Sequence, residues 1–360
     1  MSKTRLANLD LLRIISMIFI LIVHAIMYGV VGADSPAVDM SSSWAIANWA
    51  GMYWIFFLVS TGVNCYVMLS GYLLAENTSF RWKSIIKTWL TTFFYSFGIC
   101  LIFVIIGKAS PRELLTYSFP VYNDVYWFMS KFIGLMLIAP FLSMLVKTID
   151  KRTFNILFVI LSVMNLRLFK FPYGEVFGGG RSLFWFTYLY LVGAYVKLYH
   201  PFSSFKHFGK SWFIFGILLA SAYMGVQVIL YLRNGKPFDY GNTFNNSLTF
   251  VTSLLIFFWA VYHKTINSKV SSAITKIAPY IIGSYLITEH NLVRFWLWDD
   301  MLHLKDFQSS PLLLLFILII IIALFTICTL IDMGRERCFK ILHIDKAISH
   351  ILNTLQDNQH

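Results

Sequence analysis

The sequence predicts an all-α, polytopic membrane protein with about ten transmembrane helices and with its N- and C-termini in the cytoplasm. Of its 360 residues, 58% are hydrophobic and only 13% are charged, and a soluble domain cannot hide so much apolar surface beneath a polar shell. Apolar stretches of about 17 to 25 residues recur along the chain, each long enough to cross about 30 Å of hydrocarbon as a helix. Stretches of this length indicate helices rather than the strands of a β-barrel.

Ten apolar segments are candidate spans. They lie at 12–31, 49–74, 84–107, 126–146, 154–170, 184–199, 212–232, 246–263, 277–296 and 311–331. The first is long and ends in GVVGADSPAVD, unlike the short apolar core and small-residue cleavage site of a signal peptide, so we expect it to be retained. We therefore expect one transmembrane domain over 1–331.

The remaining segment, 332–360, is expected to form a cytoplasmic tail. Its apolar residues recur at helical spacing, which predicts an amphipathic helix lying on the membrane surface. They are Phe339, Leu342, Ile348, Ile351, Leu352 and Leu355.

The net charge of +12 follows the predicted membrane topology and does not require a nucleic-acid partner. With a cytoplasmic N-terminus, the predicted inner segments carry eighteen Lys and Arg residues and the outer segments nine. This excess is the positive-inside bias of a protein in the plasma membrane, and an even number of spans returns the C-terminus to the cytoplasm. The lipid bilayer is the expected partner, and no nucleic acid is expected.

Three ionisable residues interrupt the first apolar segment, NLDLLRIISMIFILIVHAI. Arg13 and His24 are eleven residues apart, which on a helix rotates them by only about 20° and separates them by about 16 Å along the axis. Asp10 precedes Arg13 by one turn and is a suitable ion-pair partner. Arg13 could simply reach the cytoplasmic interface, and His24 could hydrogen-bond a neighbouring helix for about 1 kcal/mol. Because ionisable residues inside a membrane usually have a function, we predict that both belong to a site.

The LDLLR run together with Arg13-x10-His24 resembles the signature of the acyltransferase 3 family, integral membrane enzymes that transfer acyl groups, usually acetyl, to cell-surface polysaccharides and related acceptors. The predicted number of spans agrees with this family. Further similarity lies in FFLVSTGVNCYVMLSGYLL, YWFMSKFIGLMLIAPFL, SLFWFTYLYLVGAYV and GSYLITEHNLVR. The resemblance extends over nearly the whole predicted membrane domain.

The resemblance implies an O-acyltransferase that takes its acyl group from cytoplasmic acyl-CoA, with acetyl-CoA as the expected donor, and passes it to a hydroxyl of a surface glycan. Arg13 would bind the CoA phosphates at the inner face together with further cations of that face. These are Arg81, Lys83 and Lys87. Arg81 and Lys83 approximate a basic pair that some family members carry, although the positive-inside rule explains them equally well.

His24 is the predicted general base. An imidazole with an ordinary pKa of about 6.5 can take the proton of a sugar hydroxyl as its oxygen attacks the thioester carbonyl, a role worth about 10² to 10⁴ in rate. His24 could instead accept the acyl group transiently. Both routes remain open at this point.

Two further polar residues lie in the ninth predicted span. Glu289 and His290 are about a dozen residues into it, nearly at the depth of His24. A carboxylate at that depth could orient the imidazole, and a polar helix end at the outer interface is the alternative. Many family members have His directly after Tyr-Leu-Ile, whereas here Thr288 and Glu289 precede His290, so the division of roles between Glu289 and His290 stays open.

Three candidates for substrate binding lie near the start of the fourth predicted span. Lys131 either extends its ammonium group to the outer interface or pairs with an acidic group such as Glu289. Tyr126 and Trp127 are typical of an interfacial aromatic belt, and aromatic rings at a cavity mouth also stack on sugars.

The element Ser70-Gly71-Tyr72 recurs in the family near the inner end of the second span. Close helix packing at the glycine is its simpler explanation. A donor site that includes Ser70 and Tyr72 is the second.

The Gly-rich stretch PYGEVFGGGRS at 172–182 lacks a phosphate-binding fingerprint and predicts a flexible turn or a lid on the acceptor side. No metal site is expected, because the four cysteines and the histidines of the loops and tail lack ligand spacing.

Apart from the resemblance, a ten-helix protein with buried charges is also typical of a transporter, for instance an exporter of polysaccharide or lipid-linked sugar. Transporters usually have paired repeats with broken helices at corresponding positions, and the sequence has no evident repeat. A membrane sensor or scaffold would leave Arg13 and His24 without a role.

Overall fold

The computed structural model describes residues 7–31, 42–166, 178–201, 208–234, 244–262 and 268–357. Within these ranges the chain forms α-helices joined by short 3₁₀- and π-helical segments, and it forms no β-strand. The prediction of an all-α protein is therefore confirmed. Parts of three predicted outer loops lie outside the described residues, at 32–41, 172–177 and 235–243.

The first half of the described chain contains seven α-helices and one π-helix. They are α1 (Ala7–His24), the π-helix η1 (Ala25–Val31), α2 (Ser43–Val59), α3 (Thr61–Leu74), α4 (Trp82–Ile105), α5 (Glu113–Ser118), α6 (Trp127–Thr148) and α7 (Lys151–Asn165). Two of these helices begin at side-chain caps, since Ser42 accepts from the N–H of Ala45 and Asp150 from that of Thr153.

The second half begins with a 3₁₀ turn and ends with two helices of contrasting character. Its elements are η3 (Gly179–Arg181), α8 (Leu183–Tyr199), α9 (Phe208–Asn234), α10 (Ser247–Tyr262), α11 (Ser268–Ile277), η4 (Ala278–Tyr280), α12 (Ile282–Thr288), α13 (Asn291–Phe295), η5 (Trp296–Met301), η6 (Leu304–Phe307), α14 (Leu313–Ile341) and α15 (Ile344–Asp357). The long α14 is apolar, whereas α15 is short and amphipathic.

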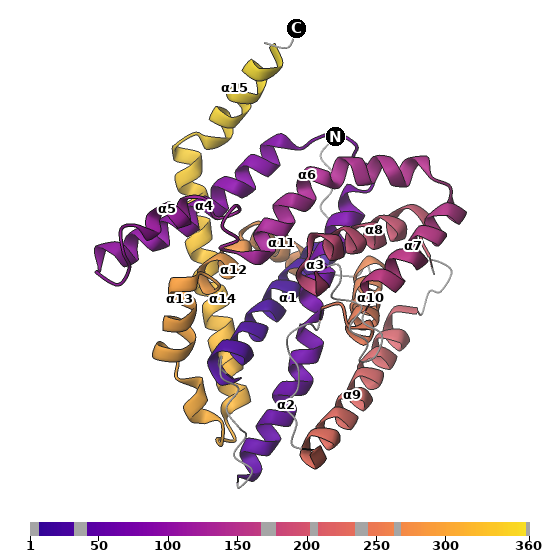
Figure 1. The fold of residues 1–360 in the computed structure, drawn as a ribbon, viewed down its shortest axis with the longest axis vertical. Coiled ribbons are helices and arrows are strands. Elements are labelled where there is room, and N and C mark those ends of the chain that lie inside the picture. Colours follow the sequence, from indigo (N-terminus) through magenta and orange to yellow (C-terminus); the bar gives the residue numbers. More distant parts are fainter. Residues whose placement is uncertain are drawn as a thin grey trace.

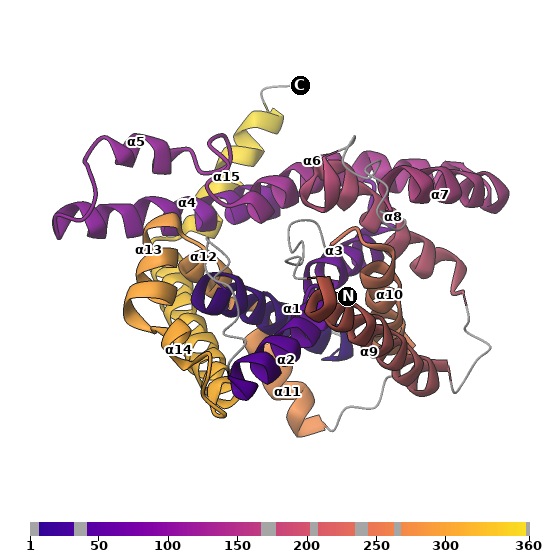
Figure 2. The ribbon, with the colours of Figure 1, turned by 60° about the horizontal axis from the view of Figure 1, so that its bottom comes forward.

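Helix α1 lies in the middle of the bundle (Figure 1). It packs against α2, α3, α10, α11, α12 and α14, so its polar residues are surrounded by protein on several sides. Figure 2 shows α4, α5, α6 and α7 along one edge of the bundle, with α13 and α14 on one flank and α9 and α10 on the other. The N-terminal helix is therefore the central one around which the other elements are arranged.

Helices α3 and α8 cross in close contact. A Cβ atom on Gly71 would lie 2.0 Å from the carbonyl oxygen of Tyr190, and one on Gly193 would lie 2.0 Å from that of Met68. Glycine at both positions allows the two backbones to touch, as small residues do at helix crossings in membranes. The expected role of the Ser70-Gly71-Tyr72 element in close packing is therefore found at its glycine.

Within the described ranges, five helical segments are long and apolar enough to cross a membrane. They are Ala7–Val30, Ser43–Leu74, Trp82–Ile105, Trp127–Thr148 and Leu313–Ile341. Only 22% of the most apolar window of the last segment is buried inside the protein, so most of that surface is free for contact with lipid. The structure supports a membrane protein, while the full count of ten spans and the orientation of the termini stay predictions.

The predicted span 277–296 is not one straight helix. Ser268–Tyr280 and Ile282–Thr288 meet at an angle of 41°, and the chain breaks again at His290, which precedes α13. Pro279 lies at the first break, where it lacks the N–H that would continue the helix. Counted together, the bent pair gives a sixth segment able to cross a membrane.

The expected cytoplasmic tail begins inside a helix. Helix α14 continues past residue 332 to Ile341, and its Asp332 and Arg335 are buried. Arg335 donates two hydrogen bonds to Asp332, at 2.8 and 3.0 Å, and the hydroxyl of Tyr95 donates a third at 2.9 Å. The end of α14 is thus fastened to α4, and the amphipathic helix predicted for the tail is α15.

Candidate active site

His24 is the last residue of α1, at the point where the α-helix widens into the π-helix η1. Such π-helical segments frequently occur at functional sites. The imidazole is 5% exposed, and its ring centroid lies 5.6 Å from that of Tyr28 and 6.0 Å from that of Tyr285. The helix therefore ends by placing a titratable base among aromatic rings.

Glu289 meets His24 from the other side of the chain. It follows the last residue of α12, and its Oε2 lies 3.2 Å from Nε2 of His24. Its Oε1 accepts hydrogen bonds from Nη1 of Arg294 at 3.1 Å and from the hydroxyl of Tyr28 at 3.3 Å. The carboxylate is 3% exposed, so the two donors on Oε1 replace part of the water that it has lost, and the imidazole lies beside Oε2 at ion-pair distance.

The contact with Glu289 engages only one of the two ring nitrogens of His24. Nδ1 of His24 has no hydrogen-bond partner among the described residues, although it is buried. When one ring nitrogen of a histidine faces a carboxylate, that contact favours the tautomer with a proton there and a lone pair on the other nitrogen. This arrangement leaves Nδ1 able to accept a proton from a ligand.

Arg294 completes the group, and the sequence alone did not single it out. Besides its ion pair with Glu289, its guanidinium lies 4.9 Å from the ring centroids of both Tyr28 and Phe295. The signal available in the sequence was a cation five residues after Glu289, within the GSYLITEHNLVR segment. The predicted topology counts this cation among the nine basic residues of the outer segments.

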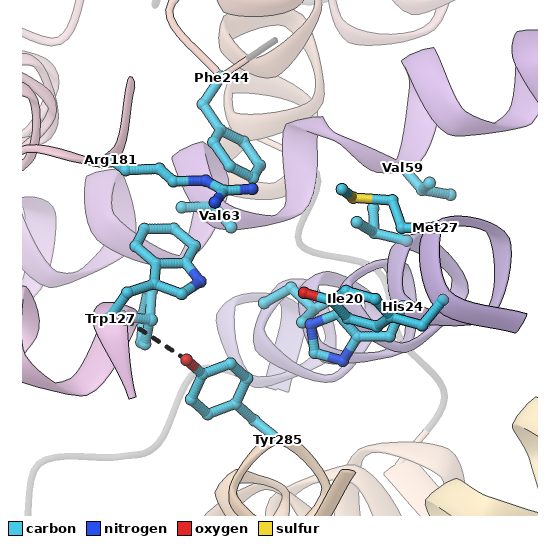
Figure 3. A pocket seen from close by; sticks show the side chains of 12 residues that line it. Ile20, His24, Met27, Val59, Val63, Trp127, Arg181, Phe244 and Tyr285 are labelled. Carbon is cyan, nitrogen blue, oxygen red and sulfur yellow. Dashed lines mark hydrogen bonds between the residues drawn. The ribbon is translucent and has the colours of Figure 1, made fainter. Parts of the chain in front are cut away.

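The imidazole lines a pocket with an empty volume of about 430 Å³, part of which is open to solvent (Figure 3). The lining comes from α1, η1, α2, α3, α6 and α12 and from the segments before α8 and α10. The lining residues are Ile20, Val23, His24, Met27, Tyr28, Val59, Val63, Trp127, Phe128, Arg181, Phe244 and Tyr285. This is a largely apolar cavity with a few convergent polar groups, as small-molecule sites usually are.

Across the pocket from His24 lies an aromatic wall with a cation on it (Figure 3). Trp127 stacks on Phe244 with ring centroids 5.6 Å apart, and the guanidinium of Arg181 lies over Trp127 at 5.3 Å. Trp127 was a predicted site residue. Arg181 was not, although its place in the GGGRS run at the predicted acceptor side was a signal for it.

Arg13 and Asp10 form the ion pair expected from their spacing. Nη1 of Arg13 lies 3.0 Å from Oδ1 of Asp10, one helical turn earlier. Arg13 is partly exposed and is not among the residues that line the pocket, whose α1 residues run from Ile20 to His24. Arg13 and His24, which were predicted to share one face of the helix, therefore lie in different surroundings.

His290 lies beside the site with both ring nitrogens engaged. Nδ1 accepts from the N–H of Leu292 at 3.2 Å and caps α13, and Nε2 lies 3.1 Å from the carbonyl oxygen of Ser96. Its ring stacks on Tyr117 with centroids 4.7 Å apart. Tyr126 is fully buried next to Tyr285 and His290, and its hydroxyl has no partner among the described residues.

Three further predicted site residues, Lys131, Ser70 and Tyr72, do not line the pocket. Nζ of Lys131 lies 2.8 Å from Oδ2 of Asp124, so its acidic partner is not Glu289. Ser70 donates to the carbonyl oxygen of Tyr66 in its own helix. Tyr72 packs edge-on against Phe257, with the ammonium of Lys197 5.4 Å from its ring centroid.

The predicted inner cations divide into one that is exposed and two that are paired. Arg81 is exposed just before α4. Lys83 donates to Ser349 of α15 at 3.0 Å, and Lys87 lies 2.7 Å from Glu336 and 3.1 Å from Asp345. The two lysines therefore contact the C-terminal helices.

Metal ligation finds no support in the part of the chain that the structure describes, where no group of three or more His, Cys, Asp or Glu side chains could hold an ion.

Comparisons with known proteins give one match. The family model Acyl_transf_3, described as an acyltransferase domain, matches residues 6–332. No curated protein and no solved structure matches the chain. The matched range includes His24, Glu289, Arg294 and every lining residue of the pocket.

Proposed function

Since the chain belongs to the acyltransferase 3 family and is a membrane acyltransferase, we propose that it moves an acyl group, in the first instance acetyl, from cytoplasmic acyl-CoA to a hydroxyl of a cell-surface polysaccharide or its precursor. It acts as a multi-pass protein of the plasma membrane. Its partners in this role are the lipid bilayer and the glycan acceptor.

One observation carries the proposal. The buried His24 pairs with Glu289 and lines a pocket, and its Nδ1 has no hydrogen-bond partner among the described residues. In this proposal Nδ1 of His24 takes the acceptor hydroxyl proton while the hydroxyl oxygen attacks the thioester carbonyl carbon. A C–O bond forms, the C–S bond breaks, and the imidazolium returns its proton to the departing CoA sulfur. Glu289 stabilises the imidazolium and fixes the orientation of the ring, as the carboxylate of a hydrolase triad does.

The donor is proposed to enter from the inner face. Arg13 is partly exposed and Arg81 is exposed there, so both guanidinium groups are accessible to the CoA phosphates. Lys83 supports them from the first turn of α4, where it already contacts α15. A long thioester arm would then connect these cations with the pocket of His24.

The direct test is an acyl-transfer assay with purified protein, radiolabelled acetyl-CoA and surface glycan. We expect His24→Ala to abolish the transfer of label, whereas His350→Ala, on the exposed side of α15, retains it. Both variants should reach the membrane in the same amount as the parent protein. Full transfer by His24→Ala would refute the role of this residue.

The same experiment separates the enzyme from the alternative exporter. Label on the glycan supports acyl transfer, and glycan movement across a vesicle membrane without label supports export. Label that stays on protein denatured rapidly at neutral pH when acceptor is omitted would indicate the covalent route through His24. Mass spectrometry of surface glycans with and without the gene identifies the hydroxyl and the acyl group.

A further inference from the structure

The pocket carries one fixed charge on its lining that the proposed chemistry does not use. Of its lining residues, Arg181 is permanently ionised, and His24 is the only other titratable group near neutral pH. The nearby carboxylate of Glu289 already has Arg294 as its counter-ion. Arg181 is exposed and has no carboxylate partner within the described ranges, so a ligand in the pocket can reach its charge.

The backbone before α8 fixes the position of this cation. Gly178 and Gly179 adopt positive φ angles of 85° and 61°, which an L side chain rarely adopts. A Cβ atom on Gly180 would lie 2.8 Å from Cβ of Phe244, so only glycine lets the turn approach the aromatic wall. Ser182 then caps α8 by accepting from the N–H of Trp185.

The side chain of Arg181 is placed for planar recognition. Its guanidinium lies over the Trp127 ring at 5.3 Å and extends along the wall toward the pocket (Figure 3). Stacking on an aromatic face occupies the plane of a guanidinium and leaves its edge N–H groups to bind a ligand. That edge is a fork of donors whose geometry fits a carboxylate or a phosphate in two parallel hydrogen bonds.

The wall beneath the guanidinium suits a sugar ring. Trp127 and Phe244 are stacked with an interplanar angle of 29° and present apolar faces to the pocket. A ring against this wall would have Arg181 beside it and His24 across from it.

We propose that Arg181 selects an anionic acceptor: the pocket takes a glycan unit that bears a carboxylate or a phosphate, binds that group through the Arg181 guanidinium, and presents a neighbouring hydroxyl to His24. This inference deepens the proposed function and rests on it. Arg181 is a specificity-determining residue and takes part in no covalent step. A neutral glycan would leave the cation unpaired and would bind more weakly.

The test uses the full chain in lipid nanodiscs and three oligosaccharides of equal length that end in glucose, glucuronic acid or glucose 6-phosphate. Dissociation constants are measured by calorimetry. We expect the protein to bind one or both anionic probes at least about tenfold more tightly than the neutral one, the scale of a charge-assisted hydrogen bond. The arm with the higher affinity tells a carboxylate acceptor from a phosphate acceptor.

Two variants assign the preference to the residue. Arg181→Gln should remove the tenfold preference and leave the affinity for the neutral probe within about twofold. Arg112→Gln is the matched control, because Arg112 is an exposed cation before α5 that does not line the pocket, and it should keep the preference. If Arg181→Gln fails to fold, the salt dependence of the unaltered protein is decisive, since added salt weakens only the binding that depends on charge.

The inference is overturned if the unaltered protein binds the charged and neutral probes with equal affinity. It is also overturned if Arg181→Gln weakens the binding of all three probes by the same factor. Transfer of label from radiolabelled acetyl-CoA to the same probes separates this failure from failure of the proposed function. Transfer without a charge preference removes the role of Arg181 and keeps the enzyme. If the anionic probes bind through Arg181 but receive no label, the proposed acyl transfer fails and the binding of an anionic glycan at Arg181 stands.

Discussion

At the scale of single residues, the site is a series of contacts that runs from Arg294 through Glu289 to His24. It ends at Nδ1 of His24, which has no hydrogen-bond partner among the described residues. Arg294 and the hydroxyl of Tyr28 hold one oxygen of Glu289, and the other oxygen faces the imidazole. Removing any member leaves a buried charge or dipole without its partner, which costs more than the contact itself contributes. Glu289 is not among the residues that line the pocket and acts through His24 and Tyr28, which are, so we regard it as a positioning residue.

Neutralising the carboxylate tests that role. Glu289→Gln keeps the shape of the side chain but cannot stabilise the imidazolium, so we expect kcat for acyl transfer to fall about 10²-fold or more while KM for the donor stays within about twofold. Glu289→Asp should restore part of the rate. Glu76→Gln, which changes an exposed carboxylate, is the control and should keep the full rate. A raised donor KM with unchanged kcat would instead place Glu289 in donor binding.

At the scale of elements, two departures from regular helix place the site. The bend at Ile281 and the break at His290 allow Glu289 and Arg294 to leave the helical register and face α1. The π-helical segment after His24 keeps Tyr28 on the same side as the imidazole, where it reaches Glu289. His290 stabilises this arrangement by capping α13 and bonding to α4.

The crossing of α3 and α8 supports the wall of the pocket and is itself testable. Gly71→Ala inserts a Cβ atom 2.0 Å from a backbone carbonyl oxygen, so the helices must separate, and overpacking of this kind costs about 1–3 kcal/mol. We expect a lower midpoint of thermal unfolding in detergent. Gly98→Ala is the control, because nothing lies within 4 Å of its Cβ position and alanine favours a helix by about 0.5–1 kcal/mol. Equal midpoints for both variants would argue against a close crossing in the membrane.

At the scale of the whole molecule, the apolar outer surface and the charged ends together imply an orientation in the bilayer. The exposed face of α14 carries Leu318, Ile319 and Ile322, each more than half exposed, which suits contact with lipid. Lys83 and Lys87 of α4 bind α15 and the end of α14, so the C-terminal helix is attached to the basic face of the protein. From the positive-inside rule we predict that this face lies in the cytoplasm.

Single cysteines test the orientation. In a variant with Cys338 replaced by serine, Tyr122→Cys should react with a membrane-impermeant maleimide in intact cells, and Lys269→Cys only after permeabilisation. Both positions are exposed, and the other three native cysteines are buried. Labelling of both positions from the same side would reverse or discard the predicted topology.

The parts of the site that sequence could predict are the local ones. Arg13 and Asp10 are three residues apart on a helix, and their ion pair follows from the spacing alone. A carboxylate able to orient His24 was also expected at Glu289 from its depth in the ninth span, and the structure brings the two together. The partner of Lys131 was not predictable in this way, because Asp124 lies in the segment before α6, outside helical spacing.

The sequence by itself determined the all-α class, the apolar first helix with its Arg and His, and the family, because composition and short spacings are local properties of the chain. Tertiary structure decided that Arg294 serves Glu289, that Arg181 and the Trp127–Phe244 wall face His24, and that the inner lysines bind the C-terminal helices. These contacts join residues from separate helices, and their formation depends on bends, breaks and glycine crossings. Helical periodicity carries no information about how separate helices are placed against one another.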